Sequence, residues 1–255
     1  MVRTSRLSLL CTLLLIAVPA DALEPIDTDG PDFVESSEVV PLGHFQYEID
    51  MVSVQDRRSD PYTATFSTPA LLRYGIADNI EFRVAPEGYF RQDGQSGWGD
   101  TAFGFKWHAQ DRNALQGKPA VSWILHVDTP SGSSQFGKSG IRPSLRSVIT
   151  WDLPDDLVLG LMPGIKYDSR EDGQRFTSAI LGAALTKRLN DKLRAFVELS
   201  ASQIARSSDG GVLASWDIGA AYLVNDNFQL GVRSGIAANR NTPNNYVLFE
   251  LAQRF

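Results

Sequence analysis

The feature that most constrains this chain is a strict alternation of apolar and polar residues, which begins at Phe45 and recurs to the C-terminus. In the stretch "HFQYEIDM" (44–51), Phe45, Tyr47 and Ile49 alternate with Gln46 and Glu48. Successive side chains of a β-strand point to opposite faces, so a two-residue period gives each segment one apolar face. The pattern therefore predicts strands, and no later stretch has the spacing of an amphipathic helix.

Twelve segments of this kind follow one another, each about ten residues long. We predict strands at 44–51, 62–76, 80–88, 100–109, 120–128, 141–151, 157–168, 176–188, 193–202, 212–224, 228–236 and 246–255. Their connections alternate between short Asn- or Asp-rich turns ("AD", "PDD", "ND", "ND") and longer loops rich in Gly, Ser and Pro. Asn and Asp tolerate the backbone angles of tight turns. The short turns should therefore lie at one end of a sheet and the long loops at the other.

The first 22 residues have the features of an export signal. Arg3 and Arg6 form a charged start, and Leu7–Ala20 is an apolar run too short to span a bilayer as a helix. Ala20-Asp21-Ala22 matches a signal-peptidase site, so we predict cleavage after Ala22. Cys11, the single cysteine of the chain, would leave with the leader. The exported chain would then have no disulfide and no thiolate metal site, and we predict neither a metal nor a cofactor.

The chain is mildly acidic, with a formal net charge of -6, and it contains no basic block. This composition argues against a nucleic-acid partner. Alternation alone does not say whether the apolar face points inward, as in a soluble barrel or sandwich, or outward to lipid. The even strand count, the division into short turns and long loops, and aromatic residues near the strand ends favour the second arrangement.

We therefore predict an all-β protein, an antiparallel up-and-down transmembrane barrel of about twelve strands in the bacterial outer membrane. The barrel would occupy residues 43–255, and an acidic periplasmic segment, 23–42, would precede it. That segment is interpreted as a tether, with a plug inside the barrel as the alternative. The last strand ends on Phe255, with apolar residues at alternate positions before it, as in the C-terminal signal of outer-membrane barrels. We expect two partners in the membrane, the surrounding outer-membrane lipid and the barrel-assembly machinery, which would bind this last strand.

Four stretches of the chain resemble a known family. "TDGPDFVESSEVVPLGHFQYE" (28–48), "PALLRYGIADNIEFRV" (69–84), "GWGDTAFGFKW" (97–107) and "DTPSGSSQFG" (128–137) are similar to outer-membrane transporters of the phenol-degradation MetA-pathway type. The "GWGD…GFKW" block followed by "TPSG" is the most specific part. Gly30 departs from the pattern, which has Arg before Pro31. The resemblance implies a porin-like channel of a Gram-negative outer membrane.

The polar faces of the predicted strands would line the lumen with balanced acids and bases. We predict that ten of these side chains form the passage: Arg73, Glu81, Arg83, Asp100, Lys106, His126, Asp128, Arg142, Arg146 and Lys166. The expected cargo is a small hydrophobic or aromatic molecule. Two alternatives are an outer-membrane lipid hydrolase, which would need a histidine on the lipid face, and a soluble periplasmic β-barrel binding protein. No nucleophile elbow, zinc-binding His pair or phosphate loop is present, so we predict no enzyme.

Overall fold

The computed structural model describes residues 23–56, 63–170 and 172–255, so the predicted signal peptide lies outside the described residues. The strands are β1 (Phe45–Asp56), β2 (Thr63–Ser67), β3 (Ala70–Ala77), β4 (Ile80–Pro86), β5 (Tyr89–Gln92), β6 (Gln95–Trp98), β7 (Thr101–Gln110), β8 (Ala120–Thr129), β9 (Arg142–Leu153), β10 (Leu157–Ser169), β11 (Arg175–Asn190), β12 (Leu193–Ile204), β13 (Val212–Asn225), β14 (Phe228–Ala237) and β15 (Asn245–Arg254). Two short 3-10 helices, η1 (Ala114–Gln116) and η2 (Ser207–Asp209), lie in connections. Among the described residues, no helix is long and apolar enough to cross a membrane.

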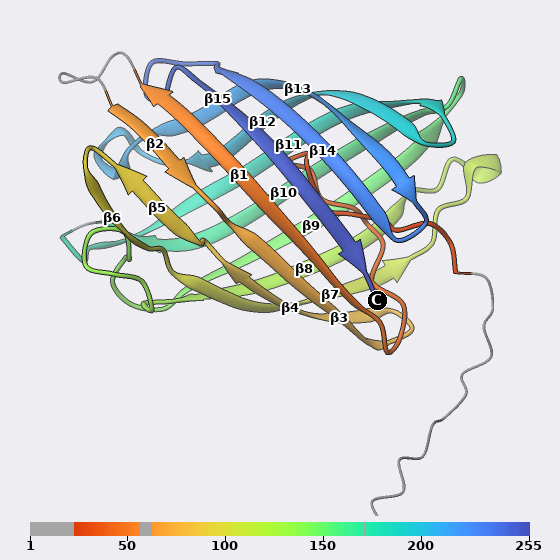
Figure 1. Cartoon of the computed structure of the whole chain (residues 1–255), viewed down its shortest axis with the longest axis horizontal. Coiled ribbons are helices and arrows are strands. Elements are labelled where there is room, and N and C mark those ends of the chain that lie inside the picture. The colour runs from red at the N-terminus through yellow and green to blue at the C-terminus, as the bar shows by residue number, and fades with distance from the viewer. Residues whose placement is uncertain (1–22, 57–62, 171) are drawn as a thin grey trace, which may run out of the picture.

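The strands form one closed antiparallel barrel (Figure 1). β15 pairs with β1 from Gln46↔Arg254 to Gln55↔Asn245, which joins the two ends of the sheet. Phe45 and Phe255 exchange two backbone hydrogen bonds at 3.2 and 2.8 Å and stack their rings beside this seam. Closure gives β1 and β15 a partner on both sides, so the sheet has no free edge at this seam.

The structure confirms the predicted number of twelve barrel strands, although three of them are interrupted. The β2–β3 strand breaks at Thr68-Pro69, the β4–β5 strand at Glu87-Gly88 and the β6–β7 strand at Gly99-Asp100. These breaks lie side by side, because Thr68 donates to the Tyr89 carbonyl at 3.0 Å and Gly99 donates to the Gly88 carbonyl at 2.9 Å. Beyond them, β2, β5 and β6 extend the wall on the side of the long loops.

Burial in the barrel is the reverse of burial in a soluble protein. Charged side chains of the inner face, such as Arg73, Arg83 and Lys106, are at most 1% exposed. Apolar side chains of the outer face, such as Phe105 and Ile218, are 46% and 62% exposed. The apolar faces therefore point away from the lumen, as expected for a wall in contact with lipid and not for a soluble barrel.

The segment 23–42 was interpreted as a tether, with a plug inside the barrel as the alternative. The structure places residues 26–40 inside the barrel, which is the arrangement of the alternative (Figure 1). The alternating pattern could not locate this segment, because its contacts are made with strands far away in the sequence.

Outward-facing positions should tolerate charge according to their depth in the membrane. Phe105 packs on Phe82 in the middle of the wall, whereas Leu153 lies at the end of β9 beside a short turn. Phe105→Arg should cost about 2–4 kcal/mol and Leu153→Arg about 0–1 kcal/mol. The measurement is the fraction of protein whose gel mobility in mild detergent shifts on heating. Equal losses in both variants would contradict the inside-out assignment.

Candidate functional site

A line of basic side chains covers the inner wall on β3, β4, β7 and β9. The strand register pairs Arg73 with Arg83, and Glu81 with Lys106, so these groups come from three adjacent strands. Arg146 lies two strands beyond Lys106, on the far side of β8. We call Arg73, Arg83, Lys106 and Arg146 the cationic cluster. Buried like charges repel one another, so such a cluster is stable only when carboxylates lie against it.

The wall itself supplies only part of the negative charge that the cationic cluster needs. Glu81 binds Arg73 through two carboxylate oxygens, with Nε–Oε1 at 2.9 Å, and Glu48 accepts from Arg73 Nη1 at 2.9 Å. His126 accepts from Arg146 Nη2 at 3.1 Å and brings no negative charge in doing so. Four basic groups therefore face two wall carboxylates.

The N-terminal segment provides the missing carboxylates. Asp29 lies 2.5 Å from Lys106 Nζ and 2.8 Å from Arg83 Nη2. Glu35 lies 2.7 Å from Arg83 Nη2 and also binds Arg146. Charge-assisted hydrogen bonds of this kind are stronger than neutral ones. We call residues 23–42 the plug, because their acidic side chains neutralise the wall from inside the lumen.

Carboxylates of the wall also accept hydrogen bonds from the backbone amides of the plug. Glu198 accepts from the amides of Phe33 and Val34 at 2.8 and 2.7 Å, and Glu81 accepts from Val40 at 2.8 Å. Glu48 accepts from the amides of Asp29 and Gly30 at 3.0 and 3.1 Å. Backbone amides that have no strand partner need other acceptors when they are buried. The wall thus satisfies an irregular segment that could not otherwise lie in the lumen.

An apolar patch lies beside the cationic cluster. It consists of lumen-facing residues on four adjacent strands: Ile124, Val148, Met162 and Ala184. Val34 of the plug packs into this patch and is 6% exposed, and Phe33 packs against it. The plug is therefore held by burial of apolar surface as well as by ion pairs.

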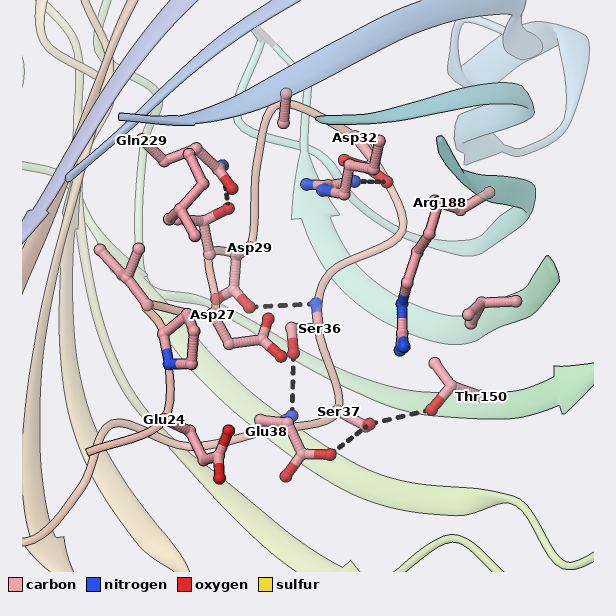
Figure 2. Close-up of a pocket in the computed structure, with 18 of the residues that line it drawn as sticks. Glu24, Asp27, Asp29, Asp32, Ser36, Ser37, Glu38, Thr150, Arg188 and Gln229 are labelled. Atoms are coloured by element: carbon pink, nitrogen blue, oxygen red, sulfur yellow. Dashed lines mark hydrogen bonds and ion pairs between the residues drawn. The ribbon is translucent and has the colours of Figure 1, made fainter. Parts of the chain in front are cut away.

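A cavity of about 850 Å³ lies between the plug and the wall near the short turns (Figure 2). The plug lines it from Glu24 to Pro41, and residues of β9 to β15 and of β1 line its other side. Figure 2 shows Ser37 beside Thr150, with the two hydroxyls 2.9 Å apart, and Asp32 facing a guanidinium group. That partner is Arg194, whose Nη1 lies 2.8 Å from the Asp32 carboxylate. The cavity shows that the plug fills only part of the lumen.

A second group of charges lies at the long-loop end of the barrel. Asp100 accepts from the amides of Gly132 and Lys138, both at 2.8 Å, and from Arg142 Nη2 at 2.7 Å. Asp100 thereby fastens the loop 130–141 to the wall.

The structure separates the ten predicted lumen residues into two groups. Six of them lie at or next to the cationic cluster: Arg73, Glu81, Arg83, Lys106, His126 and Arg146. The other four lie at the long-loop end, where Asp100 binds Arg142 and Lys166 binds Asp128 at 3.1 Å: Asp100, Asp128, Arg142 and Lys166. Strand register sets the position of the second group, since Asp128 pairs with Arg142 where β8 and β9 meet the long loop.

Sequence reasoning missed Asp29 and Glu35, which bind the cationic cluster. A signal was present, since residues 23–42 contain six acids and no base. The departure at Gly30 also has a structural correlate. A Cβ at this position would lie 1.6 Å from Glu250 Oε2, and Glu250 Oε1 has no hydrogen-bond partner among the described residues. A larger residue in place of Gly30 would therefore point at a buried carboxylate.

Loss of the plug carboxylates should release the plug. Ser37 is 1% exposed, so Ser37→Cys in a Cys11→Ser background should react slowly with a maleimide. Adding Asp29→Asn and Glu35→Gln should speed the reaction at least about tenfold, because each lost charge-assisted hydrogen bond is worth about 1.5–3 kcal/mol. Asp78→Asn with Asp191→Asn makes the same charge change in exposed turns and should leave the rate unchanged. Equally slow labelling in all variants would show that the carboxylates do not hold the plug.

The contact at the rim gives a separate prediction. Asp100→Ala removes the acceptor of two loop amides, so hydrogen exchange at Gly132 and Lys138 should accelerate at least about tenfold. Asp93→Ala, in the turn between β5 and β6, removes an acid that makes none of these contacts and serves as the control. Mass spectrometry of loop peptides gives both rates. If the loop exchanges at the parent rate without Asp100, the loop is held by other contacts.

The rim contact also explains the most specific sequence block. A Cβ on Gly97 would lie 2.1 Å from Ser133 Oγ, and a Cβ on Gly132 would lie 2.8 Å from Asp100 Oδ1. Ser133 donates its amide to the Trp98 carbonyl at 2.8 Å. The stretches "GWGD" and "TPSG" are therefore two halves of one close backbone contact, and glycine is needed where the chains meet.

The fold agrees with comparisons to solved structures. An outer membrane channel from Pseudomonas putida F1 superposes with a TM-score of 0.68 at 12% identity, over 86% of this chain and 98% of that chain. The NanC porin gives a TM-score of 0.54 at 10% identity, over 82% of this chain and 98% of its own. The KdgM porin gives 0.52 at 13% identity, over 83% and 98%. At these identities the likeness shows a shared outer-membrane barrel fold.

Sequence comparison goes further than the fold. A comparison with curated proteins gives no match. Residues 28–255 match the family described as "Putative MetA-pathway of phenol degradation". The match includes the plug from Thr28 onward, all the strands of the barrel and the two halves of the rim contact. The chain therefore belongs to this family of the MetA pathway of phenol degradation.

Proposed function

We propose that this protein is an outer-membrane channel for small hydrophobic or aromatic molecules, and that the plug closes it in the conformation described. One observation carries the proposal: the lumen is occupied by a terminal segment held through side-chain contacts and not by a strand of the wall. The plug meets the barrel backbone only at isolated points among the described residues, where the Ile26 amide donates to the Asp226 carbonyl at 2.7 Å and Leu42 forms a single bridge with Gly75. Without a continuous ladder of backbone hydrogen bonds, it can leave without unfolding the wall. Membership of the family, with its description in terms of phenol degradation, supports small aromatic cargo.

The location of the protein is part of the same proposal. The charged start, apolar run and cleavage motif of residues 1–22 support export and cleavage after Ala22. The outward apolar faces support insertion in outer-membrane lipid. The C-terminal strand ends on Phe255 at the seam of the barrel, which supports recognition of this strand by the barrel-assembly machinery. The plug then enters the lumen from the periplasmic side, where the short turns lie.

Ser122, His108 and Asp111 lie in the order of a hydrolase triad, but their hydrogen bonds do not favour a hydrolase. Ser122 Oγ lies 3.3 Å from His108 Nδ1, and His108 Nε2 lies 2.9 Å from Asp111. His108 Nδ1 is also 2.8 Å from the Ser37 carbonyl, an acceptor to which it must donate, so it cannot take a proton from Ser122. Ser122 is fully buried under the plug and donates to the same carbonyl. These atoms hold the plug, and Ser122 is not accessible to a substrate.

Planar-bilayer recording tests the proposal. The parent protein should conduct rarely, and Asp29→Asn with Glu35→Gln should raise the open fraction at least about tenfold, because the plug loses its partners on the cationic cluster. The turn variant Asp78→Asn with Asp191→Asn should behave like the parent. Protein that is folded by the heat-shift criterion, yet silent in every variant, would contradict channel function.

A further inference from the structure

The cationic cluster and the apolar patch are parts of one surface. Ile124 is the cross-strand partner of Lys106 on one side and of Arg146 on the other. The patch continues from Ile124 to Val148 on the next strand. The wall thus presents cations directly beside a dry apolar area, and both face the lumen. Balancing charge alone would not require an apolar patch beside the cationic cluster.

The plug fills the two parts with two consecutive residues. Val34 packs within the apolar patch, over Gly160 of β10 and Gly182 of β11. The carboxylate of the next residue, Glu35, binds Arg83 and Arg146. An apolar group and a carboxylate therefore occupy the surface within one short stretch of chain. The plug does not exhaust the donors available, because Arg83 Nε has no hydrogen-bond partner among the described residues.

We propose that this surface is a binding site for small aromatic carboxylates, and that Val34 and Glu35 of the plug are an internal competitor for it. The proposal rests on the proposed channel function and names the class of cargo. An aromatic ring would replace Val34 on the apolar patch, and its carboxylate would replace that of Glu35 between Arg83 and Arg146. Cargo that binds in this way displaces the plug and opens the channel that it then enters.

Charge decides in favour of an anion. When the plug leaves, Asp29 and Glu35 leave with it, and the four basic groups face only Glu48 and Glu81. Unpaired buried cations are costly, so the empty surface favours a ligand that brings negative charge. A neutral hydrocarbon would cover the patch and leave this charge uncompensated. A small carboxylate without an apolar body, such as acetate, would pair the charge and leave the patch wet.

Isothermal titration of the detergent-purified full chain with benzoate tests the site directly. Val34→Ala with Glu35→Gln weakens the competitor, so this opening variant should bind benzoate at least about tenfold more tightly than the parent. Glu38→Gln with Val39→Ala is a matched control. It makes the same two changes in the same segment, where the Glu38 carboxylate binds Arg112. Glu38 meets the cationic cluster through its backbone carbonyl, which accepts from Arg73 and Lys106 and is kept in the control. The control should bind benzoate as the parent does.

Two further arms separate the chemistry. Acetate and benzyl alcohol should each bind the opening variant at least about tenfold more weakly than benzoate, because each satisfies only half of the surface. Arg146→Gln in the opening variant should remove the gain for benzoate. Retained benzoate affinity without Arg146, or equal affinity for benzoate and benzyl alcohol, would overturn the proposal. If the opened channel conducts but shows no preference for benzoate, the binding-site proposal is wrong and the channel function stands. If benzoate binds but no variant conducts, the proposed channel function is wrong.

Discussion

The lumen of this barrel depends on the ion pairs between the plug and the cationic cluster. Strand register brings Arg73, Arg83 and Lys106 together on adjacent strands, and none of them reaches bulk water. Buried charges are tolerated only when they are paired, and the wall supplies too few carboxylates to pair them. Asp29 and Glu35 complete the balance. The position of the plug is thus a consequence of the charge built into the wall.

The contacts between the plug and the wall are specific, but they are not continuous backbone pairing. A segment that joined the wall as another strand would be held by a continuous ladder of backbone hydrogen bonds. The plug is held instead by carboxylates that accept its amides, by ion pairs and by Val34 on the apolar patch. Each of these contacts can be replaced by water or by a ligand with matching groups. Side-chain contacts of this kind suit a closure that must be reversible.

Buried carboxylates bind backbone amides and arginine side chains at both ends of the barrel, but they hold different segments. At the long-loop end, Asp100 accepts from two loop amides and from Arg142, and the glycines around it allow the backbones to approach. No part of the plug is involved in this contact. It orders a loop and leaves the closure of the lumen to the other end. The charges that sequence analysis grouped as one passage therefore serve two separate structures.

The barrel could be predicted from the amino-acid sequence alone. Alternation with a period of two fixes which side chains share a face, so the inward positions of Arg73, Lys106 and Arg146 could be predicted from the chain alone. The number of strands and the short and long connections followed from turn residues that act locally. These features depend on residues that are close together in the chain, so they can be predicted without the tertiary structure.

Only the tertiary structure decided what fills the barrel. Residues 23–42 have no period, and their partners lie up to 230 residues away, as Glu24 and Arg254 do. The segment's acids could be counted, but an acidic tether in the periplasm has the same composition as an acidic plug. The choice depends on which cations the closed sheet places opposite Asp29 and Glu35. That juxtaposition exists only after β15 has paired with β1, because closure turns one face of the sheet into a lumen.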